Sequence, residues 1–175
     1  MLQTQNHSQT KTEDSMTNIQ QKAYLIVDEY FKTEKKQTKG LFLYGPNGTG
    51  KTESMHKHTH HEDGRPKMWS GSHIDINMKV QQNNRGYLQK YSIHNMYIDD
   101  LGRGDDMITS YADRDIKVMH DLIFIRYQAF KQGYKTHFSS NLGFGELQER
   151  YGIPIADRIK EMCNIVEFKG ESLRK

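Results

Sequence analysis

The stretch LFLYGPNGTGKT, residues 41–52, decides the fold of this 175-residue chain. Its first four residues are all apolar or aromatic, which is typical of a strand buried on both faces of a parallel sheet. The eight residues that follow fit the pattern G-x-x-x-x-G-K-[S/T]. They are Gly45, Pro46, Asn47, Gly48, Thr49, Gly50, Lys51 and Thr52. A buried strand, a glycine-rich turn and a helix start therefore follow one another directly.

This turn has the chemistry of a phosphate-binding loop. Its successive backbone N–H groups and the amino end of the next helix can surround a triphosphate. Lys51 is expected to reach the β- and γ-phosphates, and the Thr52 hydroxyl is expected to ligate Mg²⁺. The alternative is a glycine-rich turn with an exposed lysine. The combination of strand, turn and helix favours ATP and Mg²⁺ as cofactors.

Two carboxylates follow a second apolar run, Met96–Ile98. We expect Asp99 to belong to the coordination shell of the metal and Asp100 to polarise the attacking water, because Mg²⁺ prefers oxygen ligands and hydrolysis needs an oriented water. The alternative is an acidic turn before Gly102. Asp is shorter than the Glu usual at the second position, so we expect slow hydrolysis.

The rest of the chain alternates between helical and strand patterns, which predicts an α/β fold of three layers, α/β/α, with a five-stranded parallel sheet. Residues 1–16 are polar and predict a flexible tail, and residues 17–175 predict one domain. The expected helices are 17–35, one or more within 74–91, 113–132, 144–151 and 155–162. The expected strands are 41–44, 68–70, 96–98, 134–140 and 164–168.

Composition limits the classes of protein that the chain can represent. Its 25 Lys and Arg against 22 Asp and Glu give a formal charge of 25 − 22 = +3, too small to indicate nucleic-acid binding alone. The apolar runs are too short for a membrane-spanning helix, so we expect no membrane partner. A single cysteine, Cys163, excludes an internal disulfide and fits the core of a cytoplasmic protein.

Four stretches carry a resemblance to a known family: LFLYGPNGTGKT, MYIDDLG, RYQAFKQGYKTHFSSNL and IADRIKEMCNIVEFKGESLRK. From about Gln21 to Lys175 the chain resembles the AAA+ ATPase domain of DnaC-type replicative-helicase loaders and the related IstB-type transposition helpers. The resemblance implies an AAA+ P-loop NTPase without a helical lid domain. It also implies a nucleotide switch in DNA replication, with a replicative helicase or a transposase as partner.

The resemblance also implies roles for single residues. Asn141 matches sensor 1, which orients the water near the γ-phosphate; the alternative is a residue that only turns the chain. Arg158 matches the arginine finger that reaches a neighbouring subunit, which implies a homo-oligomer; the alternative is a solvated helix face. Arg174 matches the sensor 2 arginine, although so near the end it could equally be frayed. Arg150 is a weaker candidate for the subunit interface.

Cations and aromatic rings alternate between residues 79 and 91, a composition that suits single-stranded DNA. The residues are Lys79, Arg85, Tyr87, Lys90 and Tyr91. The alternative is that Tyr87 and Tyr91, spaced i, i+4, pack against the sheet. The histidines His56, His58, His60 and His61 follow the loop, and we interpret them as a solvated helix end rather than a metal site.

Two other functions compete with a replication ATPase. One is a non-hydrolysing adaptor that binds ATP, DNA and a partner protein. The other is a small P-loop kinase, which would need a lid with several arginines. Arg65, Arg85 and Arg103 are scattered rather than clustered, so the kinase ranks last.

Overall fold

The computed structural model describes residues 18–174, apart from 62, 64, 66, 84, 105–107, 112 and 113. The expected flexible tail, residues 1–16, lies outside the described residues. No helix among those described is both long and apolar enough to cross a membrane.

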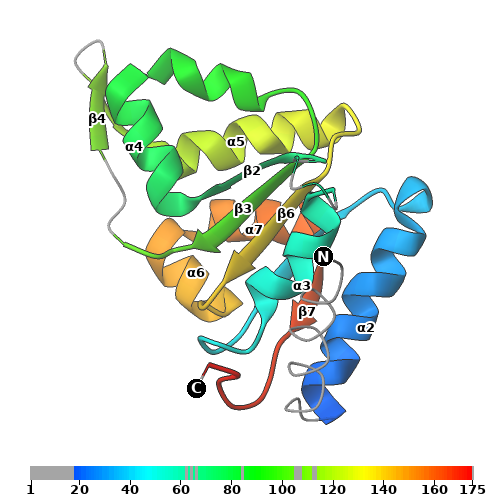
Figure 1. Ribbon diagram of the computed structural model, residues 1–175. Helices are drawn as coiled ribbons and strands as arrows, with labels where there is room; N and C mark the ends of the chain where they lie inside the picture. Colours follow the sequence, from blue (N-terminus) through cyan, green and yellow to red (C-terminus); the bar gives the residue numbers. More distant parts are fainter. Residues whose placement is uncertain are drawn as a thin grey trace.

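A five-stranded parallel sheet forms the centre of the fold, in the order β2-β3-β6-β1-β7 (Figure 1). The strands are β1 Gly40–Tyr44, β2 Trp69–Ser72, β3 Met96–Leu101, β6 Thr136–Ser140 and β7 Cys163–Glu167. The predicted fold class is confirmed. Because β1 lies between β6 and β7, and β3 lies beside β6, the carboxyl ends of β1, β6 and β3 are neighbours at one edge of the sheet.

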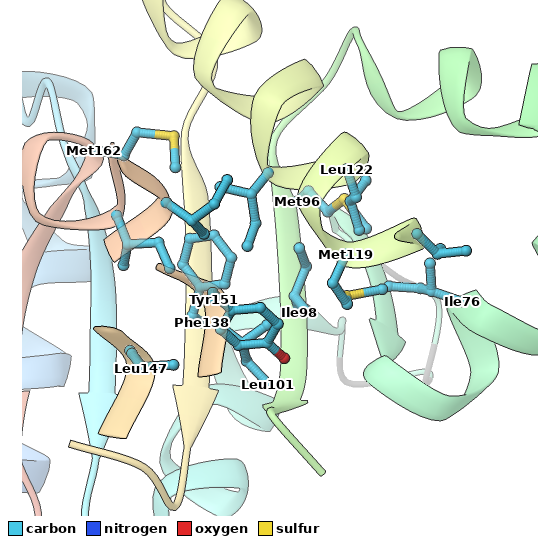
Figure 2. Packing of buried hydrophobic residues seen from close by; sticks show 14 of the residues in the cluster. Ile76, Met96, Ile98, Leu101, Met119, Leu122, Phe138, Leu147, Tyr151 and Met162 are labelled. Carbon is cyan, nitrogen blue, oxygen red and sulfur yellow. The ribbon is translucent and has the colours of Figure 1, made fainter. Parts of the chain in front are cut away.

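Helices cover both faces of this sheet. One apolar cluster joins α2 Asn18–Lys32 and α3 Lys51–Thr59 to Leu41 and Leu43 of β1. The other cluster joins the opposite side of β1, at Phe42, to α4 His73–Asn83, α5 Val118–Lys131, α6 Phe144–Tyr151 and α7 Ile153–Met162 (Figure 2). Successive side chains of β1 thus enter different cores, as the period of a strand requires. Short 3₁₀ helices η1 Glu34–Lys36 and η2 Arg85–Tyr91 complete the fold.

A buried guanidinium group lies at the edge of the second core, near the amino end of β6. Arg126 of α5 is fully buried. Its nitrogens donate to Thr136 Oγ1 at 2.9 Å, to Tyr91 O at 2.5 Å and to Lys135 O at 3.0 Å. Burial lowers the pKa of Arg126 to about 10, so the group remains charged at neutral pH. The side chain therefore joins α5 to the end of η2 and the start of β6.

The expected helix 113–132 begins too early, and this prediction is wrong at its amino end. An antiparallel hairpin, β4 Ile108–Tyr111 and β5 Arg114–Lys117, precedes α5, which starts at Val118. Residue 113 lies outside the described residues. The paired positions of the hairpin include β-branched Thr109 and Ile116, a residue type that favours strands. The expected helical region 74–91 also divides, into α4 and the 3₁₀ helix η2.

Candidate functional site

The glycine-rich loop connects β1 to α3 at the carboxyl edge of the sheet. Gly50, just before the helix, has a φ of +94°, in the left-handed region that favours glycine. A Cβ atom there would lie 2.1 Å from the Tyr24 hydroxyl oxygen. That hydroxyl donates to Gly50 O at 3.0 Å. Helix α2 therefore supports the loop directly.

Lys51 is only 5% exposed and lies inside the turn formed by the loop. Its ammonium donates to Gly45 O at 2.7 Å, to Pro46 O at 2.8 Å and to Asn141 Oδ1 at 3.0 Å. Burial lowers the pKa of Lys51, the charges of Asp100 and Asp99 oppose this shift, and that of Arg174 adds to it. The structure therefore brings the loop lysine together with Asn141, the residue that the resemblance matches to sensor 1.

Thr52 and Asp99 also meet. The Thr52 hydroxyl donates to Asp99 Oδ1 at 3.1 Å. A hydroxyl oxygen beside a carboxylate fits Mg²⁺, which prefers oxygen ligands and takes few of them from protein when phosphates supply the others. The structure thus brings together the two residues expected at the metal, and their role as metal ligands stays a prediction.

Asp100 has an unusual backbone. Its φ is +52°, and the pairing of β3 with β6 is irregular between Ile98 and Leu101. Its N–H donates to Ser139 Oγ at 3.0 Å, and its carboxylate accepts from Arg103 Nη1 at 2.7 Å. A non-glycine residue in the left-handed region costs backbone energy, and such residues cluster at functional sites. Arg103, the partner of this carboxylate, was not predicted as a site residue, because in the sequence it is only one of several scattered arginines.

The carboxyl-terminal segment 170–174 lies against the loop. Leu173 N–H donates to Gly48 O at 2.8 Å, and Gln20 Nε2 of α2 donates to Glu171 O at 2.7 Å. The charge of Arg174 acts on Lys51. The structure thus places Arg174 near the glycine-rich loop, and its expected role as a nucleotide contact stays a prediction.

Arg158 is not part of this cluster. It lies on α7, and α7 packs in the core on the opposite side of the sheet from α3. Its guanidinium lies over the rings of Phe124, at 5.3 Å, and Tyr127, at 5.6 Å. The role of Arg158 as a finger, and the homo-oligomer that a finger implies, stay predictions. Arg150 Nη2 donates to Gly104 O, on the loop after β3.

The region between residues 69 and 91 is partly packed and partly exposed. Tyr91 is 1% exposed and contacts Trp69 edge to face, which agrees with packing against the sheet rather than with base stacking. Lys79 is half-buried and Lys90 is exposed, with Lys79 Nζ 5.3 Å from the Trp69 ring and Lys90 Nζ 4.4 Å from the Tyr87 ring. Nothing is described of the Arg85 side chain.

The histidines after the loop have local partners. His58 Nε2 lies 2.8 Å from Asp28 Oδ1, and the rings of His56 and His60 stack at 4.3 Å. Within the described ranges no three His, Cys, Asp or Glu side chains gather as metal ligands would.

Comparison with known proteins places the fold. No family model matches the chain, and no curated protein matches it. The DnaC helicase loader is 18% identical, with a TM-score of 0.61 over 88% of this chain and 92% of that one. DnaI is 19% identical, with a TM-score of 0.58 over 87% and 83%. The replication initiator DnaA bound to AMPPCP and single-stranded DNA is 15% identical, with a TM-score of 0.62.

The match to DnaA covers 93% of this chain and 51% of the DnaA chain. Identities this low show the fold alone. The chain therefore has the three-layer AAA+ P-loop NTPase fold, and in structure it resembles the helicase loaders and DnaA, as the sequence predicts.

Replacing Gly48 tests the contact between the loop and the carboxyl-terminal segment. Gly48 has a φ of +78°, and a Cβ atom there would lie 2.1 Å from Ser172 Oγ. We expect Gly48→Ala to displace the segment and speed hydrogen exchange at the Leu173 amide. Gly133→Ala is the matched control, because Gly133 has a φ of +92° and nothing within 4 Å of its Cβ position. Equal exchange at Leu173 in both variants would contradict the contact.

Proposed function

We propose that the chain binds ATP with Mg²⁺, hydrolyses it slowly, and acts as a nucleotide-controlled switch in DNA replication. One observation carries the proposal. Lys51 contacts Asn141 at 3.0 Å, and Thr52 contacts Asp99 at 3.1 Å, so the loop meets the ends of two other strands. A cation, an amide, a hydroxyl and a carboxylate then surround the place where the terminal phosphates of ATP would lie.

Lys51 would hold the phosphates by exchanging partners. Its ammonium donates to two loop carbonyls and to Asn141, and a phosphate oxygen would replace at least one carbonyl. A bond between an ammonium and a phosphate joins two opposite charges, whereas the bond it replaces joins the ammonium to a neutral carbonyl, so the phosphate is the stronger partner. The amide of Asn141 accepts from Lys51 through Oδ1, so its Nδ2 group can donate to a phosphate or to the attacking water.

Thr52 and Asp99 would hold Mg²⁺, which supplies positive charge at the phosphate oxygens. Asp100 would polarise the attacking water through its carboxylate. That carboxylate also forms an ion pair with Arg103, at 2.7 Å, so the guanidinium competes with the attacking water for a carboxylate oxygen. This pairing supports slow hydrolysis, in addition to the short reach of an aspartate.

The assignment to replication rests on likeness of fold to the helicase loaders and to DnaA. One of those DnaA structures holds AMPPCP and single-stranded DNA. An IstB-like transposition helper and an adaptor that binds ATP without hydrolysis share the same loop chemistry, and measured turnover separates the adaptor from the ATPase. A small P-loop kinase remains the last of the alternatives.

Lys51→Ala is expected to raise the dissociation constant for ATP on the order of 100-fold, because charge-assisted contacts to the phosphates are lost. Lys57→Ala is the matched control, on the same helix and paired with Asp28 outside the loop. Both variants should keep a cooperative unfolding transition. Isothermal titration with Mg-ATP makes the measurement, and unchanged affinity in folded Lys51→Ala would refute the site.

Asp100→Asn should separate binding from hydrolysis. The amide keeps the size of the carboxylate but is not a base, so turnover should fall about 100-fold while ATP affinity stays within a few-fold. Phosphate release under single-turnover conditions is the readout. Full turnover in this variant would move the catalytic role to another residue.

Single-stranded DNA is the second partner that we propose, supported by the half-buried Lys79 and the exposed Lys90, each beside an aromatic ring. Replacing both lysines with Ala should weaken binding of an oligonucleotide and reduce the salt slope by about 1.4, or about 0.7 for each phosphate contact. The double variant Lys35→Ala, Lys36→Ala, on η1, is the control. No binding by the parent chain at low salt with ATP present would exclude this surface.

A further inference from the structure

Three hydroxyl groups converge on one oxygen of Asp99. Thr52 Oγ1 donates to Oδ1 at 3.1 Å, Tyr97 Oη donates to it at 2.6 Å, and Ser139 Oγ donates to it as well. None of the three donates to Oδ2. The phosphate loop accounts for Thr52, but the proposed reaction assigns nothing to Tyr97 or Ser139.

The strands explain how these groups meet. Tyr97 and Asp99 are two residues apart on β3, so they lie on the same face of the sheet. That face is the one covered by α2 and α3, because Tyr97 packs with Leu41, Leu43 and Met55. Ser139 comes from β6, the neighbouring strand. The arrangement therefore needs two adjacent strands and the start of α3.

Ser139 also links the Asp99 carboxylate to the backbone of Asp100. Its Oγ accepts from the N–H of Asp100 at 3.0 Å while it donates to Asp99. A hydroxyl can do both at once. The same buried side chain thus fixes the Asp99 carboxylate and the left-handed backbone of Asp100.

Tyr97 is suited to permanent donation. It is 4% exposed, and its hydroxyl lies 2.6 Å from Asp99 Oδ1. An ionised carboxylate only accepts hydrogen bonds, so the phenol is the donor of this bond.

From this geometry we infer that Tyr97 and Ser139 are positioning residues for the metal site, holding Asp99 by Oδ1 so that Oδ2 is presented to Mg²⁺ or to a water bound to it. The inference rests on the proposed function and deepens it. A fixed carboxylate needs no reordering when the metal binds, and preorganisation of this kind raises affinity.

Tyr97→Phe removes the hydroxyl and keeps the ring, so the core around it stays filled. In the full chain we expect the Mg²⁺ concentration for half-maximal ATP turnover to rise about tenfold, the effect of losing one hydrogen bond to a charged group. Affinity for ATP in excess EDTA should stay unchanged, because no metal is present there. If the hydroxyl only stabilised the fold, its loss would weaken ATP binding equally with and without Mg²⁺.

Tyr91→Phe is the matched control. Tyr91 is a buried tyrosine in the other core, away from Asp99. Equal Mg²⁺ requirements for Tyr97→Phe and Tyr91→Phe, in a parent chain that binds Mg-ATP, would overturn the inference and leave the proposed function standing. Ser139→Ala provides a second variant and should raise the Mg²⁺ requirement as Tyr97→Phe does.

A crystal structure of Tyr97→Phe without nucleotide tests the geometry even if the parent chain binds no ATP. Rotation of the Asp99 carboxylate, or loss of its bond from Ser139, would support positioning. An Asp99 side chain that keeps its conformation and both remaining donors would overturn the inference, whatever the outcome for ATP.

Discussion

The hydrogen bonds of the Lys51 ammonium are the interaction on which the site depends. A buried cation must be satisfied by oxygen acceptors, and here Gly45 O, Pro46 O and Asn141 Oδ1 provide them. Two of these acceptors require the loop to fold back over the start of α3. The third requires β6 to end beside β1, which the strand order β2-β3-β6-β1-β7 ensures. The hydrogen bonds of this one group thus depend on both the loop conformation and the sheet topology.

Local patterns made much of this predictable. The run 41–52 indicates a strand, a phosphate loop and a helix, and the two aspartates after Ile98 mark the carboxyl end of a neighbouring strand. Features that depend on residues distant in sequence were not predictable. The β4–β5 hairpin interrupts an apolar period that continues into α5. Arg126, on a helix, is buried because Tyr91 O and Lys135 O accept hydrogen bonds from its guanidinium. Pairing of Asp100 with Arg103 likewise follows from a left-handed turn that no pattern shows.

The structure also extends the site beyond the motif. Tyr24 of α2 holds Gly50 O, and Gln20 of the same helix holds the segment that reaches Gly48. The helix before the sheet is therefore joined to the loop directly at Gly50, and at Gly48 through the carboxyl-terminal segment. Tyr97 of β3 and Ser139 of β6 donate hydrogen bonds to Asp99. Residues of the site are thus joined by single hydrogen bonds to α2, to the carboxyl-terminal segment and to the buried face of β3. A nucleotide bound at the loop would act on all three through these bonds. Such links are what a nucleotide-controlled switch needs.

The central claim is that the loop binds the phosphates of ATP through Lys51. A crystal structure of the full chain with AMPPCP and Mg²⁺ tests it most directly. The account predicts that Lys51 Nζ exchanges at least one of its bonds to Gly45 O and Pro46 O for an oxygen of the terminal phosphate, with the metal beside Thr52. An analogue bound elsewhere on the chain, or a loop in which Lys51 keeps both carbonyl bonds at saturating analogue, would contradict it.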